Sequence, residues 1–337
     1  MLARVEVTNG GGTFDSQNPM VTRGDGLDEC RIAFEVERTL DPTPNTAQIK
    51  IYNLSQATID RITGTVRKRI EWTAAERAEL AALGASTAPI DLVYDNFGMG
   101  AITLSWGYAA ATSSGESAAP PLSVGFIGAS DSMTVDDSGV TSVLTIKAED
   151  GGQLLGAGLL RKAYKRNTST VDILGDLIEA CGLRVDRAGL ESGMQTSLIR
   201  RGIPVGELVQ LTGYNAGACP AAQQVKVVMD SLSLRWSIQD GEFLLLDTDS
   251  VLVGYPALRL SANEFSLFGN PERLEAQQMR AKTWATAEAR PGRQVLIEAT
   301  DLGTQYRIDR IKHSGDTYSG GVSVLTLDSL QTIAGIV

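Results

Sequence analysis

The sequence GVTSVLTI, residues Gly139–Ile146, returns near the end of the chain as GVSVLTL, residues Gly321–Leu327. Each copy follows a polar turn, 136–138 in one case and 315–320 in the other, and each turn follows a segment that reads as a strand. A chain that builds the same hairpin ending twice indicates two related β-domains, and such duplication usually serves quasi-symmetric assembly rather than chemistry. Chance similarity between Val/Thr-rich strands is the alternative interpretation.

Length and composition set the broad class. The chain has 337 residues, which predicts about two domains that need no metal or disulfide to fold. With 43% hydrophobic and 21% charged residues, the sequence is that of a globular protein rather than a disordered one. The 35 glycines indicate many tight turns between short strands.

The net charge of −10 is concentrated in one window. Between Asp91 and Asp150 the only base is Lys147, and the eight acids are Asp91, Asp95, Glu116, Asp131, Asp136, Asp137, Glu149 and Asp150. This field repels nucleic acid and anionic membranes, so we expect no sequence-specific nucleic acid binding. The basic run Arg161–Arg166 is expected to be a solvated loop before a helix, with a phosphate clamp as the alternative.

Other global signals are negative. Cys30, Cys181 and Cys219 are odd in number and far apart, which predicts neither a disulfide framework nor a zinc site. The first residues, 1–7, lack the apolar core of a secretion signal, and no run of about 18 apolar residues predicts a membrane span. We therefore expect synthesis and folding in the cytosol.

The pattern from 1 to 150 predicts a first β-domain. Residues 31–38 and 48–54 alternate polar with apolar, the signature of half-buried strands, and the prolines at 42 and 44 break the chain between them. A helical insertion is expected over 56–84, with capping-box spacing at Thr73–Glu76. Strands are then predicted at 102–108, 122–127 and 143–148, with a long loop over 109–121.

A helix-rich middle domain is expected over 151–230. Residues 168–170 can cap a helix that has one apolar face and ends at Gly182. Further helices are predicted over 205–212 and after Pro220, where an apolar stripe consists of Val225, Val228, Met229 and Leu232. We expect these stripes to pack internally or against a β-domain, with a partner-binding groove as the alternative.

A hairpin is predicted to open the second β-domain, 231–337. Asp240-Gly241 between two strands is the signal of a type I′ turn, because both central positions need positive φ. The two-residue loop sets Ile238 opposite Phe243 and Trp236 opposite Leu245, so we expect Trp236 in the core. The last strands are predicted at 295–299, 306–312 and 322–327.

Motifs for catalysis are weak. The single histidine, His313, is expected in a turn after a strand, bonded to a nearby carboxylate, with a catalytic base as the alternative. Neighbours in a strand point to opposite faces, so the acid pairs 136–137 and 149–150 are not expected to act together on a substrate. The sequence shows no phosphate-binding or nucleophile motif. We predict a protein that is not an enzyme, with no catalytic residue, no cofactor and no metal site.

Several short stretches, in order, resemble the baseplate hub proteins of tailed bacteriophages. They lie at 34–36, 44–55, 106–108, 126–128, 146–151, 201–202, 236–241 and 306–317. The similarity covers most of the chain and departs from the family in the insertion 56–83 and the loop 109–121. The resemblance implies an α+β, predominantly β fold with two domains like those of tail-tube proteins, each a β-barrel or sandwich.

The resemblance also implies a function. Such hubs form homotrimers in which two tube-like domains per chain make a pseudo-sixfold ring, joining a hexameric tail tube to a trimeric central spike and continuing the DNA channel. We expect a structural subunit of a contractile tail in the virion, assembled in the host cytoplasm. Its expected partners are the tail-tube or tube-initiator protein and the spike, with tape-measure and baseplate wedge proteins as further candidates. The outer strands must then pair or be covered between chains.

Some acids between Asp91 and Asp150 are expected to line that channel, with solubilising surface charge as the alternative. Two other functions remain open. One is a tail-associated cell-wall hydrolase, and the other is the hub of a related contractile injection system.

Overall fold

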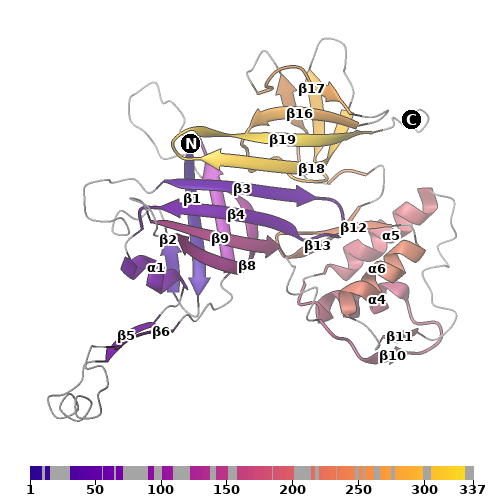
Figure 1. Ribbon diagram of the computed structural model, residues 1–337. Coiled ribbons are helices and arrows are strands. Elements are labelled where there is room, and N and C mark those ends of the chain that lie inside the picture. Colours follow the sequence, from indigo (N-terminus) through magenta and orange to yellow (C-terminus); the bar gives the residue numbers. More distant parts are fainter. Residues whose placement is uncertain are drawn as a thin grey trace.

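The structure is a computed structural model that is predominantly β, as expected, with three longer helices gathered at one end (Figure 1). It describes residues 1–9, 12–15, 31–54, 56–63, 66–70, 90–94, 101–108, 122–136, 142–150, 158–183, 185–200, 214–216, 220–232, 234–246, 250–252, 255–261, 266–274, 278–298 and 305–330. The predicted helix 205–212 and loop 109–121, together with Cys30 and Cys219, lie outside the described residues.

The first β-unit is a curled antiparallel sheet. Its strands are β1 (Leu2–Asn9), β2 (Gly12–Asp15), β3 (Ile32–Thr39), β4 (Asn45–Tyr52), β7 (Ala101–Gly107), β8 (Ser123–Asp136) and β9 (Val143–Asp150). In Figure 1, β1 crosses behind β3 and β4, so the sheet folds back on itself. Phe34 of β3 meets Trp106 of β7 at a centroid distance of 4.8 Å inside this fold. The predicted alternation in β3 and β4 therefore places one face of each strand in the core.

The second β-unit contains β14 (Leu258–Ser261), β15 (Glu272–Arg273), β16 (Gln278–Trp284), β17 (Gln294–Glu298), β18 (Gln305–Asp316) and β19 (Gly320–Ser329). Its own core includes Leu260, Val295, Ile308, Leu325 and Leu327. Strands β14 and β17 are parallel, whereas the other pairs in this unit are antiparallel.

The two units share one strand order. Side by side, the strands of the first unit lie in the order β3-β4-β9-β8-β7, and those of the second lie in the order β15-β16-β19-β18-β17. All neighbouring pairs are antiparallel, and strands at equivalent places in the two units follow one another in the same sequence order. The repeated sequence lies in β19 in its second copy, and residues 143–146 of its first copy begin β9. Leu144 and Ile146 in one copy and Leu325 and Leu327 in the other are all fully buried. The topology therefore supports the predicted duplication.

Strand β18 joins the two units into a single sheet (Figure 1). One of its edges pairs with β19, whereas the other edge pairs first with β17 through 305–307 and then with β3 through 310–316. The change of partner falls at a register shift beside Asp309. A β-bulge bends its strand and increases the local twist, and here it lets one strand belong to both units.

The insertion between β4 and β7 differs from the prediction. Helix α1 (Gln56–Thr63) ends well before residue 84, and strands β5 (Val66–Ile70) and β6 (Ile90–Tyr94) follow it as a separate hairpin. Gly64 and the β-branched Thr65 come directly after α1, and both lower helix propensity. The capping-box sequence Thr73–Glu76 lies outside the described residues.

The helical part contains α4 (Thr170–Ala180), α5 (Arg187–Arg200), α6 (Ala221–Ser231) and the small sheet of β10 (Lys162–Tyr164) with β11 (Tyr214–Ala216). Ser169 caps α4 by accepting a hydrogen bond from the Val171 amide at 3.2 Å, and Pro220 precedes α6, as predicted. The stripe on α6 is buried as expected. No pattern in the sequence predicted α5.

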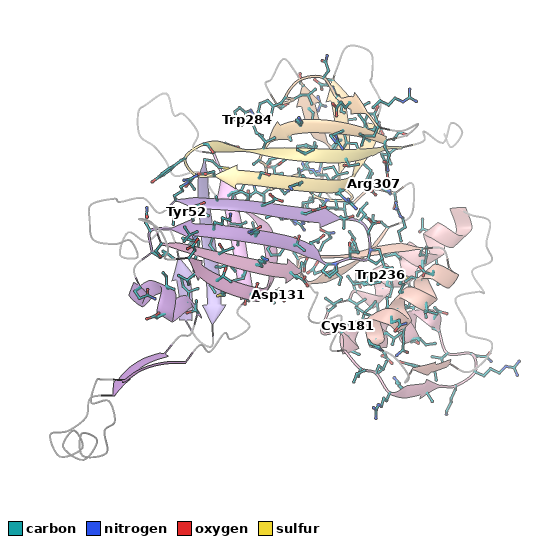
Figure 2. All side chains as sticks on the ribbon, viewed as in Figure 1. Tyr52, Asp131, Cys181, Trp236, Trp284 and Arg307 are labelled. Carbon is teal, nitrogen blue, oxygen red and sulfur yellow. The ribbon has the colours of Figure 1, made fainter. Side chains whose placement is uncertain are left out.

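The hairpin of β12 (Arg235–Gln239) and β13 (Glu242–Leu246) has the predicted register, with positive φ at Asp240 (56°) and Gly241 (78°). Trp236, labelled in Figure 2, is buried as expected, but it packs with the helices and not with the second β-unit. The hairpin is a separate two-stranded sheet. It therefore packs with the helical part rather than opening the second β-domain, because its apolar face completes the core of α4 and α6.

Candidate functional site

The exposed face of the joined sheet runs without a break across both units. Cross-strand partners point to the same side of a sheet, and one row of them reads Lys282, Val324, Lys312, Glu37, Thr46 and Glu149. The opposite face of the same strands carries the two cores. Because this face is largely polar and continues across both units, it offers an extended surface to a partner or a channel.

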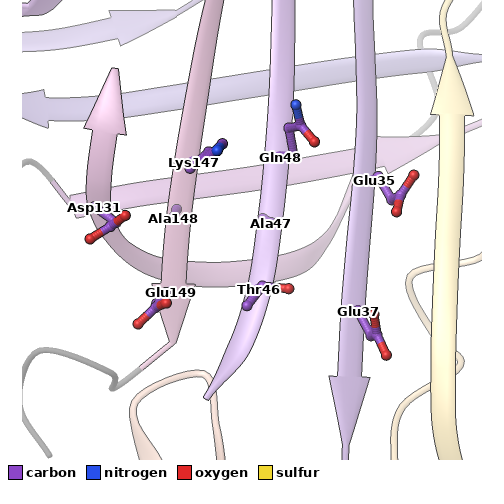
Figure 3. Close-up of a pocket in the computed structure, with 9 residues that line it drawn as sticks. All are labelled: Glu35, Glu37, Thr46, Ala47, Gln48, Asp131, Lys147, Ala148 and Glu149. Carbon is purple, nitrogen blue, oxygen red and sulfur yellow. The ribbon is translucent and has the colours of Figure 1, made fainter. Parts of the chain in front are cut away.

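A shallow hollow of about 210 Å³ lies on this face over the first unit. Glu35 and Glu37 stand on β3 at one side, and Asp131 and Glu149 stand at the other, with Lys147 on β9 near the middle (Figure 3). Ala47 and Ala148 lie between these residues, and their side chains point to the core on the opposite face of the sheet. Four carboxylates against one lysine make the hollow acidic.

Across the seam the same face becomes basic. Lys312 of β18 pairs with Glu35, and Arg310 lies 3.9 Å from Glu37 and 3.6 Å from Asp41. Glu35 and Lys312 are roughly half exposed, so the value of these pairs is small, under about 1 kcal/mol each. They nevertheless set acidic β3 against basic β18, so they favour the observed partner over a strand of the same charge.

Residues in the window 91–150 do not act as one group. Of its eight acids, the structure describes the side chains of Asp131, Asp136, Glu149 and Asp150. The first three are on the surface, whereas Asp150 is 1% exposed. Glu149 and Asp150 point to opposite faces, as predicted for neighbours in a strand. Asp137 lies outside the described residues.

Asp150 holds the turn of the β12–β13 hairpin. Its carboxylate accepts hydrogen bonds from the backbone amides of Asp240 at 2.6 Å and Gly241 at 2.9 Å. Asn45 donates to the same carboxylate at 3.3 Å and to the Ile238 carbonyl at 2.8 Å. Burial raises the pKa of Asp150, and the amide hydrogen bonds work against that rise.

Arg38 holds the same turn from β3. Its guanidinium, 1% exposed, donates to the Gly125 carbonyl at 2.9 Å, to Gln239 Oε1 at 2.9 and 3.1 Å, and to Asp240 Oδ2 at 2.9 Å. Arg290, from the loop before β17, reaches the same Asp240 oxygen at 3.3 Å. Both β-units and the helical part therefore meet at one buried polar junction, which fixes their relative positions.

A groove of about 420 Å³ lies beside this junction. Arg38, Asp240 and Arg290 form its polar part. Its apolar part includes Ile127 and Tyr255, which are 37% and 48% exposed. The groove borders all three parts of the molecule.

His313 is placed differently from the prediction. It lies inside β18 rather than in a turn, is 0% exposed, and its Nδ1 is 2.7 Å from the Ser323 hydroxyl rather than near a carboxylate. Its ring meets Trp106 edge-on at 5.0 Å. Burial and, to a smaller extent, the positive charge of Arg38 lower the pKa of His313 to about 3. A histidine sealed between the two cores cannot serve as a base for an external substrate.

The run Arg161–Arg166 also differs from the prediction of a loop, because β10 occupies its centre. Lys162 pairs with Asp176 of α4, and the Tyr164 hydroxyl donates to the same carboxylate at 2.8 Å. Arg187 of α5 reaches Asp176 at 2.9 Å. Through Asp176, the run thus connects β10 to α4 and α5. No local pattern in the sequence predicts this contact.

The described residues contain neither a cluster of metal ligands nor a membrane-spanning helix. Among the described residues, no group of three or more His, Cys, Asp or Glu side chains is arranged to hold a metal ion. No helix in the described part of the chain is long and apolar enough to cross a membrane. Cys181 is buried, and burial raises the pKa of its thiol to about 11.

Comparison with known proteins supports the fold. No protein-family profile and no curated protein matches the sequence. The structure is similar to a 43 kDa tail protein of prophage MuSo2 from Shewanella oneidensis, with a TM-score of 0.54 and 8% identity over 97% of this chain and 98% of that one. It is also similar to a tail protein from Neisseria meningitidis MC58, with a TM-score of 0.50 and 9% identity over 97% of each chain. The chain therefore shares its fold with phage tail proteins.

Proposed function

We propose that this protein is a structural subunit of a phage tail baseplate hub that adapts a hexameric tail tube to a trimeric spike. The observation that carries the proposal is the pair of β-units with the same strand order, joined side by side through β18 and β3. Three such chains supply six similar positions, so a threefold assembly can meet a sixfold one. The fold shared with phage tail proteins supports this proposal.

The proposal includes a set of partners and a location. The protein forms a homotrimer in the virion, contacts the tail-tube or tube-initiator protein on one side, and contacts the central spike on the other. Tape-measure and wedge proteins are further partners, and the tail is contractile. The boundary at 150/151 is part of the same proposal, whereas the boundary predicted at 230/231 moves to after the hairpin, which packs on the helical part.

The test of this function is the composition of assembled tails. Electron microscopy or native mass spectrometry of purified tails should show three copies between tube and spike, with six β-units in a ring. Monomers in the tail, or a ring of six chains, would overturn the symmetry-adapting role. A contractile injection system would give the same ring, and gene order beside tape-measure and spike genes separates it from a phage.

A role without enzymatic activity is part of the proposal. The one histidine is buried in the sheet, and Glu149 and Asp150 face opposite sides, so neither supplies a pair of groups in a cleft. We expect the purified chain to release no soluble fragments from peptidoglycan. Turnover above that of an unrelated tail protein would favour the cell-wall hydrolase instead.

The acidic hollow suggests how the exposed face serves a channel. Like charge keeps DNA from adhering to a wall, and Glu35, Glu37, Asp131 and Glu149 supply that charge on the first unit. Replacing these four by Gln or Asn should slow or stall DNA ejection from otherwise intact virions. Neutralising Asp172, Glu179, Glu191 and Glu242, which are exposed elsewhere, is the matched control. Unchanged ejection in the first variant would remove the channel role.

A further inference from the structure

Strand β8 of the first unit is the counterpart of β18, and the two have the same kind of irregularity. Each has a register shift next to an aspartate, Asp131 in β8 and Asp309 in β18. Before the shift, β8 pairs with β7 up to Ala129, as β18 pairs with β17 up to Arg307. After the shift, β18 pairs with β3, whereas no described strand pairs with the same edge of β8 over Ser132–Val135.

Exposure of the core-side residues shows the same difference. Ile311 in β18 pairs with Leu325, and Val135 in β8 pairs with the equivalent residue Leu144. Ile311 is 0% exposed, but Val135 is 38% exposed. The two residues lie at equivalent places in the two units and pair with equivalent residues. Ile311 lies beside β3 at the seam, whereas Val135 has no described strand at the same place.

The counterpart of β3 is β15, at the opposite end of the sheet. It pairs with β16 on one edge, and no described strand pairs with its other edge. Leu274, directly after β15, is 38% exposed, so this end also shows an apolar side chain. An open edge with an apolar residue is a surface that proteins normally pair or cover.

Charge at the two open edges is complementary. Strand β8 carries Asp131 and Asp136 and no cation. The hairpin of β15 and β16 carries three cations, Arg273, Arg280 and Lys282, against Glu272. At the seam inside the chain, acid and base likewise face each other across β3 and β18. Two copies of this chain would meet with opposite charges at these edges.

We propose that the Ser132–Val135 edge of β8 in one copy binds the β15 edge of a second copy. This joint between chains repeats the β3–β18 joint within the chain and closes the ring. The proposal rests on the proposed trimeric function, and it assigns the edges that the proposed trimer leaves open. Main-chain hydrogen bonds supply the attraction, and Val135 and Leu274 become covered.

Cross-linking between differently labelled copies tests the joint. Two alleles, Thr134→Cys and Glu272→Cys, are co-expressed in assembling tails, in a background with Ser at positions 30 and 219. Buried Cys181 is kept. A short bismaleimide should join one copy of each allele, and mass spectrometry should identify the 134–272 link. The matched control pairs Thr134→Cys with Lys226→Cys on α6, which is exposed and belongs to neither edge, and should give no link.

A second pair of variants measures the contribution of the apolar side chains. Val135→Lys and Leu274→Lys should each weaken association of the full-length chain about tenfold or more, measured as the concentration at which oligomers dissociate. The thermal midpoint of the monomer should be unchanged, because both side chains are partly exposed. Val227→Lys on α6, where the valine is 59% exposed, should leave association unchanged.

The outcomes separate the two proposals. A 134–272 link in tails that contain three copies supports both. Three copies per tail without this link, and with no effect of the lysine variants, overturn the joint and leave the hub function standing. Tails that contain single copies overturn the hub function and the joint together.

Discussion

The carboxylate of Asp150, at the end of β9, accepts a hydrogen bond from the amide of Gly241 at 2.9 Å, in the turn of a hairpin from the helical part. Asp150 is buried, so this contact replaces water for both groups. Gly241 has a positive φ of 78°, as the two-residue turn requires. A single side chain of the first β-unit thereby binds the backbone of a turn that lies far away in the sequence.

Replacing Asp150 by Ala should destabilise the protein by about 2–4 kcal/mol, because two buried amides and Asn45 lose their acceptor. Urea unfolding measures the loss, and hydrogen exchange should rise at the hairpin before the rest of the sheet. Glu149→Gln, one residue away on the open face, is the control and should change stability by under about 0.5 kcal/mol. Equal effects of the two variants would mean that the turn is held by other contacts.

Replacing Arg38 by Leu should cost about 3–5 kcal/mol, since Asp240 and Gln239 would keep their buried oxygens without the guanidinium. Arg310→Leu, which removes a half-exposed pair, should cost less than about 1 kcal/mol. A double-mutant cycle with Asp240→Ala isolates the coupling between Arg38 and Asp240. Additive effects in that cycle would contradict a direct contribution of the pair.

His313 makes stability depend on pH. Its folded pKa is about 3, whereas an unfolded histidine titrates near 6.5, so only the unfolded chain gains a proton between these values. The contribution of His313 is therefore lost as the pH falls below about 6.5, by up to about 1.4 kcal/mol per pH unit. His313→Gln should unfold in urea with a shallower loss of stability between pH 7 and pH 5.

Ser323→Ala is the control for this effect, because it keeps the histidine and should keep the slope. If His313→Gln and the parent chain lose stability in parallel from pH 7 to pH 5, His313 is not the titrating group. Carboxylates lose their stabilising charges at lower pH, so the window above pH 5 reports chiefly on the histidine.

Gly125 gives a test of packing inside the first unit. An alanine Cβ at this position would lie 1.9 Å from the ring of Trp106, which is 1% exposed. Gly125→Ala should therefore cost about 3 kcal/mol or more, through displacement of the ring or of β8. Ser123→Ala on the exposed start of the same strand should be nearly neutral, and thermal unfolding compares the two. A neutral Gly125→Ala would show that the ring has room to move.

Local patterns in the sequence predicted much of the fold. The hairpin register followed from Asp240-Gly241, and the ends of α4 and α6 followed from Ser169, Gly182 and Pro220. The duplicated strands were visible because Leu144 and Leu325 sit in nearly identical sequences. In each case the signal lies within a few residues of the feature that it specifies.

Other strands escaped prediction because their signal is weak. The inward side of β16 consists of Met279, Ala281 and Thr283, which alternate but include only one large apolar residue. In β18 the inward positions after Ile311 are His313 and Gly315, so the end of the strand looked like a turn. Because His313 is polar although it is buried, hydropathy alone does not show that this segment is a strand.

The junction could not be predicted for a different reason. Arg38, Asn45, Asp150 and Asp240 are far apart in the chain, and no spacing rule relates them. Their contacts depend on where the helical part docks. The pairing of β18 with β3 is equally non-local, and without it the exposed face of the two units could not be joined into one surface.

The pairing of β3 with β18 also joins two segments that the ribosome makes at different times. The ribosome makes β3 long before its partner edge, 310–316. Throughout that interval β3 presents unpaired backbone groups to every neighbouring nascent chain. Truncation before Arg310, or crowding of polysomes, would therefore favour the exchange of strands between copies, so completion of 310–316 protects β3 from misassembly.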